Sequence, residues 1–260
     1  MESLVYGSMM EEPILKAYYG DIFFEFMLQK KSADAIIILP GLPSSNSSDE
    51  ILRFFYSKGY HVFSPKYKGT YQSNGKFLKT NIVEDLSAFL DALNTCSAKS
   101  LWDGKRLNFR IKEKILLGGS FSGAIACGLA AKRKELSRII LFAPIWNFVK
   151  HNEFGDEQDL LFVTGLIRRM YKHLYRFDFK NIQKQLSNVK EIDPSNYLKS
   201  LDQPILIFHD PNDKTVSIRH TYQMLKLLKR GQLVAVGYGH ALRVKALQKL
   251  YPKIDAFLND

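Results

Sequence analysis

Cysteine is scarce in this sequence, because only two of the 260 residues, Cys96 and Cys127, are cysteines. Two thiols exclude a fold held together by several disulfides, and they lack the paired spacing that binds zinc. Unpaired cysteines in a chain of this length are typical of a reducing compartment, so we expect a cytoplasmic protein. Cys127 lies in a run of small residues, and we expect it to pack within a helix.

Long hydrophobic runs are also missing. The longest purely apolar stretches have about five residues, such as Ala35–Leu39, whereas a membrane-spanning helix needs about 20 apolar residues. Residues 1–16 do not combine a basic start with a long apolar core. The sequence therefore predicts neither a transmembrane segment nor a signal peptide.

Acidic residues are outnumbered by basic ones, 26 to 37, which gives a formal net charge of +11. Such a balance attracts nucleic acid, anionic membranes or acidic substrates. No base-reading motif accompanies the charge, so a nucleic acid is not predicted as a partner. The charge would also suit a small-molecule substrate that is anionic. The sequence implies no metal or organic cofactor.

Short apolar runs alternate with helical patterns along the chain, which predicts an α/β fold with a mostly parallel central sheet flanked by helices. We expect residues 1–260 to form one domain. A helical, aromatic and basic insertion is predicted at about 147–200, where no strand pattern is visible. The predicted strands are 14–18, 22–27, 35–39, 60–64, 114–117, 138–142, 204–208 and 233–236. The predicted helices are 50–57, 81–93, 121–131 and 244–258.

The strongest motif is Gly118-Gly119-Ser120-Phe121-Ser122-Gly123, which joins a buried strand pattern directly to a helix pattern. A serine at such a junction lies on a very tight turn, and small residues must stand two positions before and after it. This segment resembles the nucleophile elbow G-x-S-x-G of the α/β-hydrolase superfamily, with Ser122 in place of the last glycine. The resemblance implies that Ser120 is a nucleophile, while Ser122 remains its rival.

A serine nucleophile needs a base, usually histidine. Of six histidines, only His240 follows the last predicted strand in a loop of small residues. In the α/β-hydrolase superfamily the base occupies this place, so the resemblance implies that His240 is the general base.

The base in turn needs a carboxylate that fixes its tautomer. The segment 204–216 resembles the family's strand and turn that supply this acid, and Asp213 falls at the matching position. Asp210 replaces the family's usual glycine and remains the rival acid. His209 matches the family's histidine at the strand end, and we interpret it as part of the scaffold.

The oxyanion of a tetrahedral intermediate needs backbone N–H donors. The resemblance implies that one donor is the N–H of Phe121, directly after the nucleophile. The other is the N–H of Leu42 in the loop Pro40–Pro43, where Pro40 replaces a histidine of the family pattern. A plain Pro-Gly turn is the alternative interpretation of that loop.

The resemblance implies a serine hydrolase that cleaves a carboxylic ester or thioester through an acyl-serine intermediate. A small peptidase or amidase of the prolyl-oligopeptidase-like branch, a lipase-like enzyme on anionic membrane, and a non-catalytic binding protein are the alternatives. Two features of the insertion stay open. Its basic residues either attract anionic partners or form a solvated face, and its aromatic residues either line a pocket or form the insertion's own core. These aromatic residues are Trp146, Phe148, Phe154, Phe162, Tyr171, Tyr175 and Phe177.

Overall fold

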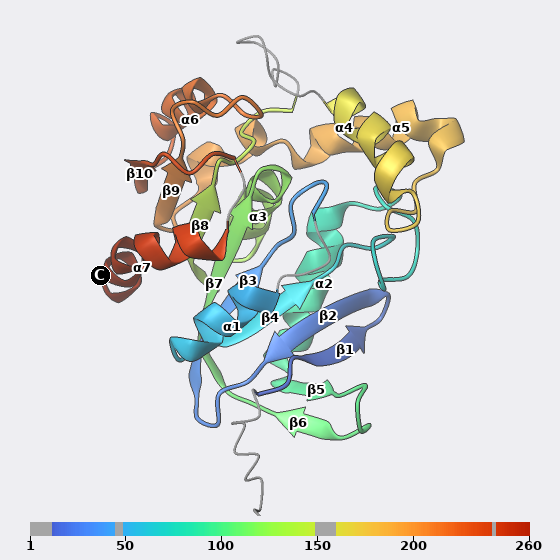
Figure 1. Cartoon of the computed structure of the whole chain (residues 1–260), viewed down its shortest axis with the longest axis vertical. Coiled ribbons are helices and arrows are strands. Elements are labelled where there is room, and N and C mark those ends of the chain that lie inside the picture. The colour runs from blue at the N-terminus through green and yellow to red at the C-terminus, as the bar shows by residue number, and fades with distance from the viewer. Residues whose placement is uncertain (1–11, 45–48, 149–159, 241–242) are drawn as a thin grey trace, which may run out of the picture.

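An eight-stranded sheet runs through the centre of the computed structural model, which describes residues 12–44, 49–148, 160–240 and 243–260. The strand order is β1-β2-β4-β3-β7-β8-β9-β10 (Figure 1). Its strands are β1 (Leu15–Tyr19), β2 (Ile22–Met27), β3 (Ala33–Ile38), β4 (His61–Pro65), β7 (Ile111–Gly119), β8 (Leu136–Phe142), β9 (Ile205–His209) and β10 (Gly231–Ala235).

The six strands from β4 to β10 in this order pair in parallel, and only β1 and β2 run antiparallel to their neighbours. The predicted mostly parallel sheet is therefore confirmed. Because parallel strands end at the same edge, the loops that follow β3, β7, β8, β9 and β10 meet at one edge of the sheet, where ligands of such sheets bind.

Helices cover both faces of the sheet, as predicted (Figure 1). On one face, α1 (Asp49–Ser57) and α7 (Val244–Asn259) enclose one apolar cluster with the sheet; on the other, α2 (Ile82–Asn94) and α3 (Phe121–Lys132) enclose a second. Helix α3 is buried almost all round and packs tightly on α2. Cys127 lies within α3, fully buried as expected, and burial raises the pKa of its thiol to about 12.

In its described residues, 143–148 and 160–204, the segment between β8 and β9 contains helices, turns and coil, and its one β-type pairing is the isolated bridge of Tyr175 with Thr70. We call residues 160–201 the cap. Its elements are α4 (Leu160–Leu166), the π-helix η1 (Ile167–Tyr171), α5 (Ile182–Ser187), and the 3-10 turns η2 (Phe179–Asn181), η3 (Asn188–Ile192), η4 (Pro194–Asn196) and η5 (Leu198–Ser200).

Backbone hydrogen bonds join the cap to the loop that follows β4. Arg176 N–H donates to Gly69 O at 2.7 Å, Tyr71 N–H donates to Leu174 O at 2.7 Å, and Phe77 N–H donates to Arg176 O at 3.1 Å. The Arg176 guanidinium adds hydrogen bonds to backbone carbonyls of the same loop. These contacts fix the cap above the carboxyl edge of β4.

Four elements differ most from the sequence prediction: β5 (Ser97–Lys99), β6 (Arg106–Asn108), α6 (Ile218–Leu225) and β7. The hairpin of β5 and β6, outside the main sheet, was not predicted, because its residues are mostly exposed and form no apolar run. Helix α6 was missed because its buried side includes His220 and Thr221. Strand β7 begins before the predicted residue 114, at a polar and partly exposed stretch.

No helix within the described part of the chain is long and apolar enough to cross a membrane.

Substitution of Gly69 tests how tightly the loop after β4 is packed, and Gly20, in the turn between β1 and β2, is its control. Both Gly69 (φ +74°) and Gly20 (φ +52°) lie in the left-handed region, but a Cβ on Gly69 would lie 2.0 Å from Phe77 N, whereas one on Gly20 would meet open space. We expect Gly20→Ala to lower the free energy of unfolding by about 1 kcal/mol, from backbone strain alone. Gly69→Ala should cost clearly more, because the loop must shift. Denaturant unfolding of both variants measures this, and equal losses would contradict the packing described.

Candidate active site

Ser120 lies on a strained turn between β7 and α3. Its φ of 53° and ψ of −124° are unusual for a residue with a side chain. Hydrogen bonds hold this backbone on both sides, since Ser120 N–H donates to Phe142 O and Ser120 O accepts from the N–H groups of Gly123 and Ile145, each at 3.0 Å. The half-buried Ser120 hydroxyl makes no hydrogen bond within the described residues, so it is free to meet a ligand.

The neighbours of Ser120 leave no room for larger side chains. A Cβ on Gly118 would lie 2.8 Å from Ser122 O, one on Gly119 would lie 2.9 Å from Phe142 O, and one on Gly123 would lie 2.4 Å from the Pro144 side chain. The small residues expected from the motif are therefore required by contacts with backbone and with β8.

Ser122 is buried, and its hydroxyl is engaged within the turn. It accepts a hydrogen bond from Gly119 N–H at 2.7 Å and donates to Gly119 O at 2.8 Å. The serine that replaces the family's last glycine thus stabilises the turn beside Ser120. This geometry favours Ser120 over Ser122 as the residue that can reach a substrate.

Asp213 and His240 are joined by a hydrogen bond of 2.8 Å between Oδ2 and Nδ1. The Asp213 side chain is fully buried and that of His240 is 24% exposed. Because an ionised carboxylate only accepts, Nδ1 carries the proton and Nε2 is left as an acceptor. The structure therefore brings two of the predicted site residues together, in the orientation that presents Nε2.

The second oxygen of Asp213, Oδ1, accepts hydrogen bonds from the N–H groups of Thr215 at 2.8 Å and Val216 at 3.1 Å. Burial acts to raise the pKa of Asp213, but the His240 hydrogen bond and charge together with these two N–H groups outweigh it, and the pKa lies below its ordinary value. Asp213 is therefore held as a carboxylate.

Asp210, the rival acid, has a different set of partners. Its Oδ1 accepts from Asn212 N–H at 2.8 Å, and its Oδ2 accepts from Gly239 N–H at 2.7 Å. Asp210 thus connects the turn after β9 to the residue directly before His240. Its side chain positions the loop of the histidine, a role that the sequence pattern did not suggest.

His209 is buried in a chain of hydrogen bonds beneath this turn. Its Nε2–H donates to Val216 O at 2.9 Å and its Nδ1 accepts from Thr221 Oγ1 at 2.8 Å, while Trp146 Nε1–H donates to the same Thr221 oxygen at 3.1 Å. Burial lowers the pKa of His209, which favours the neutral form. These contacts agree with the scaffold role expected of His209.

The loop after β3 lies beside the Ser120 turn, since a Cβ on Gly41 would stand 3.7 Å from Gly119 O. Leu42 N–H, an expected oxyanion donor, has no acceptor among the described residues. The other expected donor is the N–H of Phe121, which begins α3 and so has no intrahelical acceptor. The two unpaired donors come from the two neighbouring loops named in the sequence analysis.

Tyrosines hold this loop in place. Tyr67 OH donates to Pro40 O at 2.9 Å, Ser44 N–H donates to Tyr175 OH at 3.1 Å, and Tyr71 OH donates to Ser44 O. Tyr175 belongs to the cap, so the position of the loop depends on the cap. The sequence pattern indicated this role for none of the three tyrosines, and named Tyr175 only as an aromatic residue of the insertion, because these contacts join residues far apart in the chain.

Three of the six described aromatic residues named for the insertion pack inside the protein, and two more, Phe148 and Tyr171, are partly buried against the core. Trp146, Tyr175 and Phe177 are buried, whereas Phe162 is half exposed. Phe154 lies outside the described residues. The interpretation of these side chains as a core thus holds for the three buried ones.

Ser120 and His240 approach the same edge without a hydrogen bond between their side chains in the described structure. A small cavity of about 20 Å³ lies beside His240 and is also lined by Phe142 and Ala143, and Phe142 O binds Ser120 N–H. Its volume suits about one water molecule. Phe142 therefore contacts both the Ser120 turn and the cavity beside His240.

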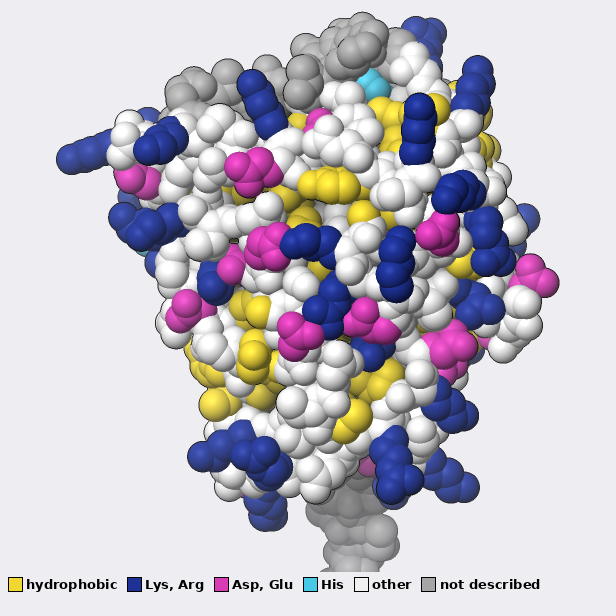
Figure 2. All heavy atoms as spheres, turned by 180° about the vertical axis from the view of Figure 1, so that it is seen from behind, with side chains coloured by type: hydrophobic (Ala, Val, Ile, Leu, Met, Phe, Trp, Pro, Cys, Tyr) yellow, Lys and Arg dark blue, Asp and Glu magenta, His cyan; other side chains and the backbone are white. Residues whose placement is uncertain are grey.

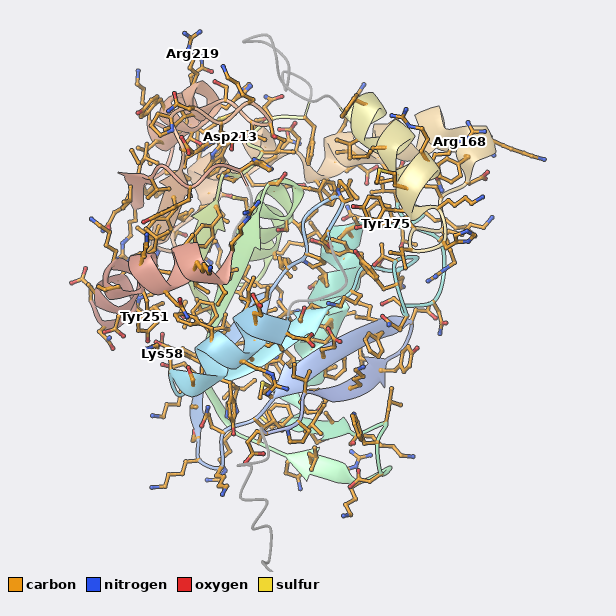
Figure 3. All side chains as sticks on the ribbon, viewed as in Figure 1. Lys58, Arg168, Tyr175, Asp213, Arg219 and Tyr251 are labelled. Carbon is orange, nitrogen blue, oxygen red and sulfur yellow. The ribbon has the colours of Figure 1, made fainter. Side chains whose placement is uncertain are left out.

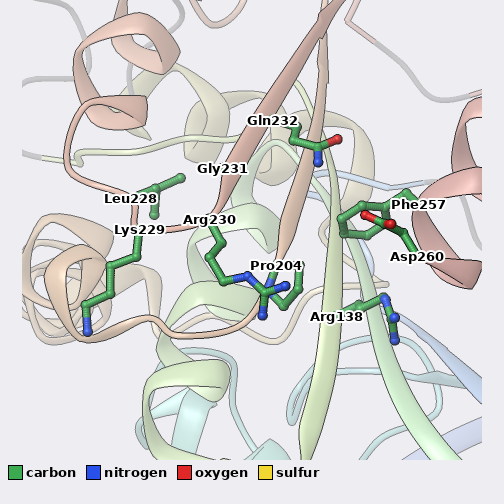
Figure 4. A pocket seen from close by; sticks show the side chains of 9 residues that line it. All are labelled: Arg138, Pro204, Leu228, Lys229, Arg230, Gly231, Gln232, Phe257 and Asp260. Carbon is green, nitrogen blue, oxygen red and sulfur yellow. The ribbon is translucent and has the colours of Figure 1, made fainter.

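A larger cavity, of about 330 Å³, opens at the opposite end of the sheet (Figure 4). It is lined by residues at the amino ends of β8 and β10, including Arg138 and Arg230, and by Phe257 of α7. It is remote from Ser120 in the fold, and it is not part of the candidate site.

The fold has many relatives among solved structures. An esterase from Pyrococcus furiosus is 16% identical over 95% of this chain and 89% of that chain, with a TM-score of 0.67. Est1E from Butyrivibrio proteoclasticus, solved with ferulic acid bound, is 16% identical over 95% and 100%, with a TM-score of 0.67. An α/β hydrolase from a metagenome of sediments of the Mar Chica lagoon in Morocco is 17% identical over 94% and 97%, with a TM-score of 0.60. No protein-family model and no curated protein matches the sequence. At these identities the similarity concerns the fold.

The buried His209 predicts a pH dependence of stability. Its pKa is lowered in the folded protein, so the unfolded chain takes up a proton first as the pH falls through about 6.5, and unfolding becomes easier. His209→Gln removes this titration, and the free energy of unfolding of the variant should fall less steeply between pH 7.5 and 5.5, whatever its value at pH 7.5. Denaturant titrations at a series of pH values measure both slopes. Parallel slopes would show that His209 does not contribute.

Proposed function

We propose that this chain, which has the α/β-hydrolase fold, is a serine hydrolase that cleaves a carboxylic ester or thioester. The observation that carries the proposal is the hydrogen bond of 2.8 Å between buried Asp213 and His240, at the sheet edge where strained Ser120 presents a free hydroxyl. Ser120 is the nucleophile, His240 the general base and Asp213 the acid that orients the base.

The reaction begins when Ser120 Oγ attacks the substrate carbonyl and His240 Nε2 takes its proton. The required contact between Oγ and Nε2 forms in the substrate complex, as is common for catalytic hydrogen bonds that are long in a free enzyme. The N–H groups of Phe121 and Leu42 bind the oxyanion. The imidazolium, stabilised by the Asp213 carboxylate, protonates the leaving group, and water then releases the acid from the acyl-serine.

Ester substrates are favoured over amides by the comparisons, since one similar structure is an esterase and another holds ferulic acid, a carboxylic acid. A small peptidase or amidase would use the same groups and is the second candidate. Its support is the Gly-Gly-Ser elbow of the sequence.

The nucleophile is tested by Ser120→Ala beside Ser122→Ala as the matched control. We expect Ser120→Ala to lower kcat on nitrophenyl esters at least about 10³-fold and to abolish labelling by a serine-directed phosphonate. Ser122→Ala should keep labelling and most of the turnover, with some loss of stability because the Gly119 contacts disappear. A parallel series of aminoacyl anilides separates esterase from peptidase. Turnover that survives Ser120→Ala would refute the mechanism.

Substitution of Asp213 and of Asp210 should lower the activity to different extents. Asp213→Asn removes the acceptor of Nδ1–H and favours the wrong tautomer, so we expect kcat to fall by about 10³–10⁴. Asp210→Ala frees Gly239 N–H and loosens the His240 loop, which should lower kcat about 10- to 100-fold and leave KM nearly unchanged. Steady-state kinetics of both variants on the ester that the wild type turns over fastest measure these changes in kcat and KM. If Asp210→Ala proves the more damaging change, the roles assigned here are reversed.

A further inference from the structure

Tyr67 lies between the two segments that carry the expected oxyanion donors. Its hydroxyl donates to Pro40 O at 2.9 Å, in the loop of Leu42. Its ring meets the ring of Phe121 edge to face, with 6.1 Å between the two centroids. One side chain therefore contacts both the loop of Leu42 and the first residue of α3.

Few other hydrogen bonds hold the loop of Leu42. Pro40 and Pro43 have no N–H to donate. Within the described part of the chain, the bond from Tyr67 is the only hydrogen bond that residues 40–43 make. The place of the Leu42 N–H therefore depends on Tyr67, because the backbone of the loop does not fix itself.

The backbone beside Tyr67 is anchored to β2. Lys66 N–H donates to Phe23 O at 2.8 Å, and the buried Lys66 Nζ lies 3.1 Å from Glu25 Oε2. The carbonyl of Tyr67 accepts a hydrogen bond from the Thr70 hydroxyl at 2.8 Å. A buried ion pair is costly to break, because the partner left behind keeps an uncompensated charge. Tyr67 thus has a fixed place from which its hydroxyl can hold a neighbouring loop.

The Tyr67 hydroxyl keeps its proton near neutral pH. Tyr67 is 2% exposed, and burial, to which the neighbouring Tyr175 adds, raises its pKa well above the ordinary value. Tyr175 comes from the cap, and Figure 3 shows it on the side of the cap that lies toward the protein. The Tyr67 hydroxyl is therefore a neutral donor to Pro40 O.

We propose that Tyr67 is a positioning residue that sets the distance between the N–H groups of Leu42 and Phe121. This role rests on the acyl transfer proposed for Ser120, because only an oxyanion needs the two donors together. Both donors must lie about 2.7–3.1 Å from the place that the oxyanion takes. The hydroxyl fixes the loop of Leu42 and the ring packs on Phe121, so both donors are held against one residue.

The matched variants are Tyr67→Phe and Tyr18→Phe. Each loses a tyrosine hydroxyl that donates to a backbone carbonyl at 2.9 Å, but Tyr18 lies in β1 and binds Gln72 O in the loop after β4. Loss of a whole oxyanion donor costs about 10²–10³ in kcat, so a misplaced donor in Tyr67→Phe should lower kcat on esters about tenfold. KM should stay within about twofold, because the ground-state carbonyl needs the donors less than the oxyanion does. Tyr18→Phe should keep both constants.

A trifluoromethyl ketone gives a second readout. Ser120 Oγ adds to its carbonyl carbon, His240 takes the proton, and the carbonyl oxygen becomes an oxyanion that occupies the hole. The inhibition constant should rise in Tyr67→Phe by the factor by which kcat/KM falls, as for a transition-state analogue, and stay unchanged in Tyr18→Phe. A merely structural loss would lower the free energy of unfolding without this parallel.

The effect of Tyr67→Phe should not depend on salt. Figure 2 shows acidic and basic side chains close together over the rear surface of the molecule, and salt screens such exposed charges. The hydroxyl of the buried Tyr67 and the carbonyl of Pro40 are both neutral. The ratio of wild-type kcat to variant kcat should therefore be equal at low and high salt. A ratio that falls toward one at high salt would assign the loss to surface charge and overturn the proposal.

Hydrogen exchange measures the loop without turnover. The N–H groups of residues 39–44 should exchange about 3- to 10-fold faster in Tyr67→Phe than in the wild type, which is the effect of one lost hydrogen bond on a local opening. Unchanged exchange, unchanged kcat, or an equal loss of kcat in Tyr18→Phe would overturn the role of Tyr67 and leave the proposed function standing. A wild type without turnover that depends on Ser120 would instead refute the proposed function, and the role of Tyr67 with it.

Discussion

The strained backbone of Ser120 is the constraint on which the arrangement of the site depends. A non-glycine residue in this conformation costs about 1–3 kcal/mol and persists only where its surroundings fix it. Phe142, Ile145 and Gly123 hold its N–H and C=O, and the Ser122 hydroxyl closes the turn from inside. The same tight turn brings α3 against β8, which is why side chains are excluded at Gly119 and Gly123. Strand, turn and helix are therefore one unit.

Asp210 and Asp213 are three residues apart but have different roles, because different backbone N–H groups donate to their carboxylates. Asp213 accepts two N–H groups from its own turn and one from His240, whereas Asp210 accepts one N–H from its turn and one from the residue before His240. Burying a carboxylate is costly unless such donors compensate it. Both acids therefore position the histidine, one through the ring and one through the backbone. His209 and Thr221 support the turn from below.

The sequence was sufficient where the signal is local. Apolar runs located the main strands, and the cluster of small residues located the turn at Ser120, because both depend on neighbours in the chain. It was insufficient where partners are distant. The contact of Asp210 with Gly239 spans 29 residues and that of Tyr175 with Ser44 spans 131. Neither contact produces a local pattern that a single sequence could reveal. The hairpin β5–β6 was missed for another reason, since a short exposed pair of strands has no apolar periodicity.

The basic residues of the cap have the same charge in the sequence, but in the structure they have different surroundings. The guanidinium of Arg176 is bound to carbonyls of the loop after β4, so its charge serves the attachment of the cap. Arg168 lies over the ring of Phe179, with 5.7 Å to the ring centroid, and Arg169 and Lys172 extend from the exposed side. The aromatic residues divide in the same way, since Tyr175 is buried and Phe162 is not. The attachment of the cap to the rest of the fold therefore uses only some of the cap's cations and aromatic side chains.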